Sequence, residues 1–255
     1  MAIHRKFFAT NPGNLGGSDL PSWAPDWSSI QSSHVSPSWY NANNGLKAIY
    51  ELSPHGLALR IKGILVKNVR EVADADLRPE QFAGPRVYDY DCISVWQKWC
   101  QLASLLAQYS RSEDLQETLW RTLCWDSTDF QRPAPLDYKH KFDAWYQILL
   151  SSDRTPTEMG NDLLANHNAM QFAHEVSFQN WQKALCITED GRMAMVPAKA
   201  QPNDQIAILS GSRLPFIIRP TSDYYTLIGV CYVHGIMDGE AFPTEESGLE
   251  WITLC

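Results

Sequence analysis

Residues 206–218, IAILSGSRLPFII, carry the pattern that decides the fold. Two short apolar runs flank a Ser-Gly-Ser tripeptide, and apolar runs on either side of a glycine turn predict a β-hairpin. A similar arrangement precedes them at 185–196, where the dipeptide Asp190-Gly191 is typical of a type I′ turn. A longer apolar run follows at 224–233. Short strands at this spacing predict a small β-barrel or a curled antiparallel sheet over residues 186–255.

The rest of the chain predicts β structure followed by helices. Apolar and polar side chains alternate over residues 46–72, which indicates strands. Apolar side chains then recur at helical spacing, and the stretch Thr155–Glu158 predicts a helix start from which the pattern continues to Trp181. We therefore expect an α+β fold in one compact unit. Its parts are an extended strap and β segment over 1–89, a helical region over 90–185 and the barrel-like region over 186–255.

Tryptophan is unusually frequent, with ten residues in the chain. Each indole can bury on the order of 200 Å² and needs a partner for its ring N–H. The rings therefore either fill the core, which composition favours, or line an aromatic pocket. Pro21 and Pro25 stiffen an extended segment that presents Trp23 and Trp27. We interpret this segment as a strap whose two indoles anchor it to the core or contact a ligand.

Composition excludes several classes of function. The chain has 21 basic and 29 acidic side chains and a formal net charge of −8, which argues against a nucleic-acid partner. No apolar run approaches the ~20 residues of a membrane helix, and the first residues do not form a secretory signal. The six cysteines lack zinc-site spacing, so we expect reduced thiols and a cytoplasmic protein.

The motifs that bind cofactors are missing from the sequence. It contains no glycine-rich dinucleotide motif, no phosphate loop and no nucleophile elbow. His140, His167 and His174 fall in the helical region, but they lack the spacing of a metal site, and we expect solvated or capping histidines. We therefore expect no cofactor and no metal.

The strongest candidate for chemistry is the end of the last long apolar run. Tyr232, His234, Asp238 and Glu240 place a phenol, an imidazole and two carboxylates within nine positions, with Met237 among them. His234 is a candidate general base or hydrogen-bond donor that Asp238 or Glu240 would orient. The alternative is a polar cluster in which the acids cap a turn and His234 satisfies buried backbone groups.

A second candidate group surrounds Arg121. Arg121 and Trp125 are four positions apart and would share a helix face. Such an arginine can anchor an acidic or carbonyl-bearing ligand, with Trp120 and Trp125 supplying aromatic contacts. The alternative, which we favour from sequence, is a structural ion pair between Arg121 and Asp126 or Glu117.

Three stretches together resemble a known family. They are DLPSWAPDWS at 19–28, LWRTLCWD at 119–126, and the run from Asp190 that ends in YVHGIMDGE at 232–240. In this order they resemble the C-terminal region of fungal heterokaryon-incompatibility (HET-domain) proteins, over nearly the whole chain. In that family an effector domain similar to the Toll/interleukin-receptor fold precedes this region. We expect this chain to lack that domain, so we do not expect the cell-death activity that the family name implies.

Two functions are compatible with these features. The first is a stand-alone HET-like protein that acts as a cofactor-independent cyclase or isomerase in fungal secondary metabolism. A Diels–Alder-type cyclisation of an apolar terpenoid or polyketide would need an aromatic cavity that preorganises the substrate and polar groups such as His234, Tyr232 and Arg121. Its partner would be a small apolar metabolite. The alternative is a non-enzymatic regulatory or recognition module, whose partner would be a protein.

Overall fold

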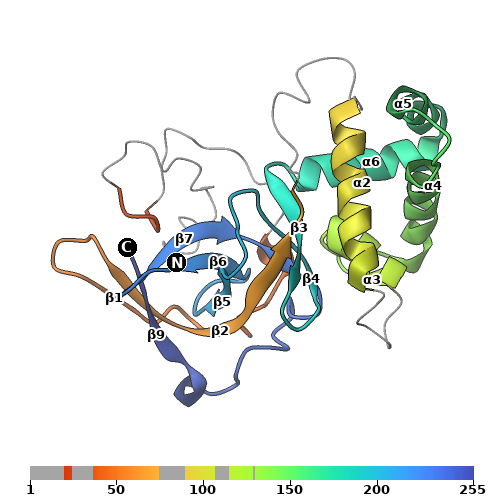
Figure 1. Cartoon of the computed structure of the whole chain (residues 1–255). Helices are drawn as coiled ribbons and strands as arrows, with labels where there is room; N and C mark the ends of the chain where they lie inside the picture. Colours follow the sequence, from red (N-terminus) through yellow and green to blue (C-terminus); the bar gives the residue numbers. More distant parts are fainter. Residues whose placement is uncertain (1–19, 25–36, 75–89, 107–114, 129) are drawn as a thin grey trace.

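The computed structural model describes residues 20–24, 37–74, 90–106, 115–128 and 130–255, and the account below concerns these residues. A β part and a helical part lie side by side (Figure 1). Trp27 lies outside the described residues, and so does the stretch 110–113, whose sequence Ser-Arg-Ser-Glu predicts a capping box at a helix start. No described helix is both long and apolar enough to cross a lipid bilayer.

Five strands of the described chain close into a small barrel. They are β2 (Leu59–Val72), β5 (Gln205–Leu209), β6 (Phe216–Pro220), β7 (Tyr225–Val230) and β9 (Glu250–Leu254). Strand β2 pairs antiparallel with both β5 and β9, and the order β5, β6, β7, β9 leads back to β2. A parallel contact of Tyr225 with Leu254 joins β7 to β9 and closes the ring. The prediction of a small barrel or curled sheet is thus confirmed.

The barrel interior is a packed apolar core. Leu59 and Ile61 of β2 point inward and are buried, whereas Arg60 between them is exposed. This alternation follows from the two-residue period of a strand. The same inner cluster contains Ala207, Leu209, Phe216, Ile218, Leu227, Ile252 and Leu254. Side chains therefore fill the interior, as is usual for a barrel of so few strands.

Strand β2 continues beyond the barrel into a second set of strands. Its last residues pair with β3 (Lys183–Thr188), which pairs with β4 (Met193–Pro197), and β4 pairs with β8 (Tyr232–Val233). At the other end of β2 the short strand β1 (Tyr50–Leu52) forms a hairpin with it. The turn of this hairpin contains Gly56 in the left-handed region.

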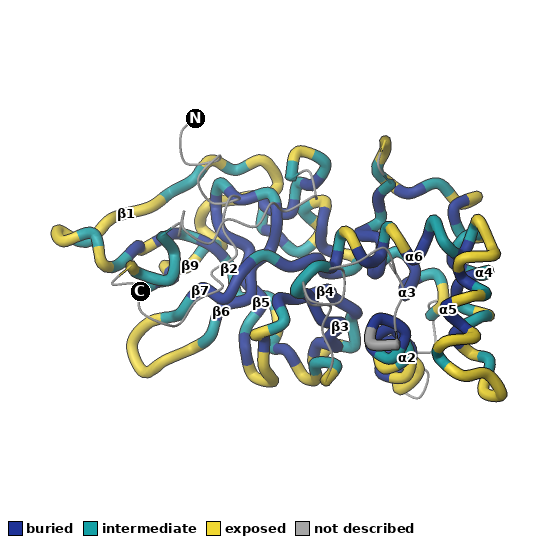
Figure 2. The backbone as a smooth tube through the Cα atoms, turned by 90° about the horizontal axis from the view of Figure 1, so that it is seen from above, coloured by how far each residue is buried: buried dark blue, intermediate teal, exposed yellow. Residues whose placement is uncertain are grey.

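Every residue of β3 and β4 is buried. Leu185 and Met195 belong to the core shared with the helices, whereas Cys186 and Val196 belong to the cluster on the outer side of the barrel. These two strands are therefore covered on both faces, which explains why their sequence is continuously apolar rather than alternating. Figure 2 shows this buried stretch between the barrel and the helices.

The helical part contains five described α-helices. They are α2 (Tyr90–Leu105), α3 (Leu115–Leu123), α4 (Lys139–Leu149), α5 (Pro156–Ala165) and α6 (His167–Gln179). The described chain also contains three short 3₁₀ turns, η2 (Pro37–Trp39), η5 (Leu136–Tyr138) and η6 (Glu246–Gly248). Helix α2 packs on β3 and α3 on β4. Helix α5 begins at the predicted helix start, where Thr155 and Glu158 form a capping box. The continuous helix expected up to Trp181 is instead two helices, because the Asn166 side chain caps α6 and ends α5 there.

Tryptophan rings fill the core of the helical part. Trp96 and Trp145 meet edge to face, with ring centroids 5.7 Å apart. Among the tryptophans that the structure describes, five are fully buried: Trp96, Trp99, Trp120, Trp125 and Trp145. The interpretation that these rings build the core is confirmed for these five.

Candidate functional site

The sequence motif at 232–240 lies at the junction between the barrel and the helices. Tyr232 and Met237 are buried, His234 is half-buried, and Asp238 and Glu240 are exposed. The Tyr232 ring packs against Trp125 and Tyr40, at centroid distances of 5.7 Å and 6.4 Å. Burial raises the pKa of the Tyr232 phenol well above its ordinary value. The phenol is therefore a neutral group in a packed aromatic cluster.

The polar groups of this motif make their hydrogen bonds in different directions. Asp238 accepts from both terminal nitrogens of Arg132, at 2.6 Å and 2.7 Å. Glu240 accepts from the backbone N–H of Asp238 at 2.8 Å. Nδ1 of His234 lies 3.4 Å from the Tyr232 hydroxyl. The carboxylates thus bind Arg132 and a backbone amide rather than orient His234, and this arrangement matches the alternative of a polar cluster at a turn.

Arg132 was not singled out from the sequence, yet it connects the two parts of the molecule. Its guanidinium lies over the Tyr40 ring at 4.5 Å and donates to the Trp39 carbonyl at 3.0 Å. Its partner Asp238 is 106 positions away. No sequence-local signal points to such a pair. We call Arg132, Asp238, Tyr40, Tyr232 and Trp125 the joint.

Arg121 is held in a second cluster of structural contacts. It donates to Glu117 at 2.7 Å, to Asp126, and to the Ala134 carbonyl at 3.1 Å. Its guanidinium lies 4.3 Å from the centre of the Trp120 ring, whose N–H donates to Glu117 at 2.7 Å. Both ion pairs of the structural alternative are present.

Trp125 does not share a helix face with Arg121. Helix α3 ends at Leu123, and Trp125 follows with a φ of +56°. Its indole N–H donates to the side-chain oxygen of Asn180 at 2.8 Å. Trp23 packs instead against the barrel interior cluster. The described tryptophans with predicted ligand roles therefore belong to two separate apolar clusters, and their roles in binding stay predictions.

Lys183 is a buried cation behind the joint. Its Nζ donates to the Val230 carbonyl at 2.6 Å and lies 5.7 Å from the centre of the Trp125 ring. Burial lowers the pKa of Lys183 from its ordinary value of 10.5 to about 8. One carbonyl and one ring face replace the water that this ammonium group loses.

We expect Lys183→Met to raise the free energy of unfolding by about 2 kcal/mol near pH 7. At about 1.4 kcal/mol per pKa unit, the buried charge costs about 3 kcal/mol. Methionine removes that cost but leaves the Val230 carbonyl without its donor, which costs about 1 kcal/mol.

The pH dependence of this gain follows from the direction of the pKa shift. Below about pH 8 Lys183 is charged in both the folded and the unfolded state, so Lys183→Met gives its full stabilisation. Between about pH 8 and 10.5 the unfolded chain binds more protons, so the native lysine protein gains stability and the advantage of methionine shrinks. Urea unfolding near pH 7 and pH 10 measures this, with Lys67→Met on the exposed side of β2 as control. A variant less stable than the parent near pH 7 would contradict the prediction.

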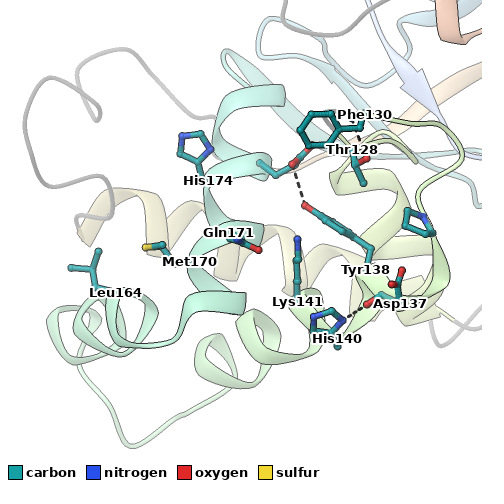
Figure 3. Close-up of a pocket in the computed structure, with 12 residues that line it drawn as sticks. Thr128, Phe130, Asp137, Tyr138, His140, Lys141, Leu164, Met170, Gln171 and His174 are labelled. Atoms are coloured by element: carbon teal, nitrogen blue, oxygen red, sulfur yellow. Dashed lines mark hydrogen bonds between the residues drawn. The ribbon is translucent and has the colours of Figure 1, made fainter.

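An open groove lies on the helical part beside the Arg121 cluster, since the ring of its lining residue Tyr138 lies 6.4 Å from the Trp120 ring (Figure 3). Its volume is about 600 Å³, and it is formed by the segment 128–141 together with α5 and α6. Its lining residues are Thr128, Phe130, Pro135, Asp137, Tyr138, His140, Lys141, Leu164, Met170, Gln171, His174 and Glu175. None of the described side chains that the sequence suggested as catalytic or ligand-binding lines it. We call this feature the helical groove.

The family comparison covers part of the helical groove and three of the five barrel strands, β5, β6 and β7. Residues 137–249 match the family model of the Het-6 beta-barrel domain. Over this stretch the chain is similar to the Het-6 beta-barrel domain family. The match begins at Asp137 in the helical groove and ends just before β9.

A curated relative supports the same relationship. The chain is 23% identical over 269 aligned residues to heterokaryon incompatibility protein 6, OR allele, of Neurospora crassa. The alignment covers 89% of this chain and 39% of that protein, so the chain spans about two fifths of the relative's length. No solved structure matches the chain. The predicted resemblance of this chain to fungal heterokaryon-incompatibility proteins is confirmed.

Proposed function

We propose that this protein is a recognition module and that its helical groove binds a small apolar metabolite. The observation that carries the proposal is the groove itself. Its volume of about 600 Å³ lies within the range of roughly 300–1,000 Å³ that is usual for small-molecule sites. Such sites are mostly apolar with a few polar groups that orient the ligand.

The lining of the helical groove has this mixed character. Phe130 and Leu164 are exposed at its edges, at 92% and 56% of their surface. The Tyr138 ring and the Met170 side chain supply further apolar contacts, and Gln171 supplies an amide. Large apolar side chains that are exposed around a concave surface are typical of ligand sites.

The joint supports a recognition role in a second way. The Arg132–Asp238 pair fixes the segment that leads into the helical groove against the segment that follows β8. A rigid scaffold that positions a binding surface loses less entropy when a ligand binds.

The cofactor-independent cyclisation of a terpenoid or polyketide is a second hypothesis with a different requirement. It needs a cavity in which Tyr232, His234 or Arg121 meets the substrate. Tyr232 is instead packed against Trp125 at the junction, and Arg121 is held in ion pairs with Glu117 and Asp126. Incubation of the purified chain with polyene aldehydes tests this hypothesis, because only product formation that is lost in His234→Ala would support it.

The recognition proposal is tested with N-phenyl-1-naphthylamine, a neutral apolar dye that fluoresces when bound. We expect saturable binding of one dye per chain. Leu164→Glu places a charge at the groove edge and is expected to weaken binding at least ~10-fold, since the dye would have to desolvate it. Leu57→Glu in the β1–β2 turn is the matched control, because Leu57 is exposed to a similar extent. Absence of saturable binding, or equal weakening by both substitutions, would overturn the proposal.

A further inference from the structure

We infer that the helical groove selects an amphipathic anion, a small molecule with a carboxylate or sulfonate group on an apolar body. This inference rests on the proposed function and names the chemical class of its ligand. It is carried by the position and the partners of one cation, Lys141.

Lys141 extends into the helical groove (Figure 3). Its Nζ lies over the Tyr138 ring, 4.5 Å from the ring centre. Within the described chain no carboxylate lies at ion-pair distance from this ammonium group. The neighbouring Lys139 differs, because it pairs with Asp143 at 2.7 Å. An aromatic face holds a cation in place without neutralising its charge, so Lys141 keeps its charge for an incoming anion.

The two acids that line the groove do not compensate Lys141. Glu175 accepts from the Tyr138 hydroxyl at 3.1 Å and from Gln179 at 2.6 Å, so both of its oxygens have donors. Asp137 is exposed and lies beside His140 at one end of the groove in Figure 3. Water screens an exposed carboxylate at the edge, whereas Lys141 is half-buried.

Apolar side chains flank the cation on both sides. Met170 and Leu164 lie on one side of Lys141 in Figure 3, and Tyr138 and Phe130 lie on the other. A ligand whose apolar body contacts these side chains would place its anionic group at Lys141. Desolvation by that body strengthens the ion pair, because charges interact more strongly away from water.

Two dyes with the same apolar body test this inference. 1-Anilinonaphthalene-8-sulfonate is N-phenyl-1-naphthylamine with an added sulfonate, so the pair isolates the effect of the negative charge. We expect the sulfonate dye to bind at least ~5-fold more tightly at low salt and to lose this advantage as salt rises. We also expect 1-naphthoate, a carboxylate of similar shape, to compete with it.

Substitutions at Lys141 assign the effect to one side chain. Lys141→Gln should weaken binding of the sulfonate dye ~10-fold and leave the neutral dye within twofold, and Lys141→Arg should restore the sulfonate affinity. Lys139→Gln is the control and should change neither. Near-ultraviolet circular dichroism verifies that each variant is folded.

The outcomes separate this inference from the proposed function. If the neutral dye binds in the groove but the sulfonate brings no advantage, the inference is overturned and the recognition role stands. The same conclusion follows if folded Lys141→Gln binds both dyes as the parent does. If neither dye saturates a site that Leu164→Glu removes, both the inference and the proposed function are overturned.

Discussion

Replacing Arg121 with alanine is expected to lower the free energy of unfolding by about 4 kcal/mol, the range for removing one partner of a poorly solvated ion pair. Arg121 is 16% exposed and binds Glu117 and Asp126, whose side chains are 30% and 15% exposed. Alanine would leave two carboxylates without their counterion and would remove the cation from the Trp120 ring. The Ala134 carbonyl would also lose its donor.

Urea unfolding followed by tryptophan fluorescence measures this effect. Arg154→Ala is the control, because the Arg154–Asp162 pair is more exposed and should contribute less than about 1 kcal/mol. If Arg121→Ala were as stable as Arg154→Ala, the Arg121 cluster would not support the fold. That result would favour the other role that the sequence suggested for Arg121, as a ligand anchor.

Replacing Gly211 with alanine is expected to destabilise the protein by about 3 kcal/mol. Gly211 lies in the turn between β5 and β6 with a φ of +80°. A Cβ atom there would lie 2.5 Å from the Cβ of Ala48 and 2.8 Å from two of its backbone atoms. Since backbone atoms cannot rotate away, the segment around Ala48 must shift, and its hydrogen bond from Gly211 to the Leu46 carbonyl would be strained.

Gly56→Ala provides the matched control for the backbone strain alone. Gly56 has a similar φ of +68°, but a Cβ there would meet no atom within 4 Å. We expect Gly56→Ala to cost about 1 kcal/mol, the penalty of a left-handed residue with a side chain. Equal melting temperatures for the two variants would show that the turn at Gly211 accommodates a Cβ atom without loss of stability, and would contradict the prediction.

The sequence predicted the elements of the fold better than their closure. Alternating and apolar runs located most strands because burial on one or both faces determines those patterns. Closure depends on pairs such as Gly63 with Leu209, which are far apart in sequence and leave no local signal. The Asp190-Gly191 turn also differs from the predicted type I′, since only Gly191 has a positive φ. A type I′ turn needs a positive φ at both central residues.

The site was harder to predict than the fold. The pair of Arg121 with Glu117 follows from their helical spacing and was anticipated. The Arg132–Asp238 pair joins distant segments, and the helical groove brings the segment 128–141 to α6, so neither had a local pattern. The only signal for the groove was its histidines, His140 and His174, which the sequence could not distinguish from solvated ones.

The position of strand β2 in the sequence determines where an expression fragment of this protein can begin. The matched region 137–249 leaves out both β2 and β9, which are two of the five strands of the barrel. An expression fragment cut to those boundaries would expose the edges of β3, β5 and β7, and bare edges of this kind promote aggregation. A fragment that keeps the barrel closed therefore has to include residues 59–254.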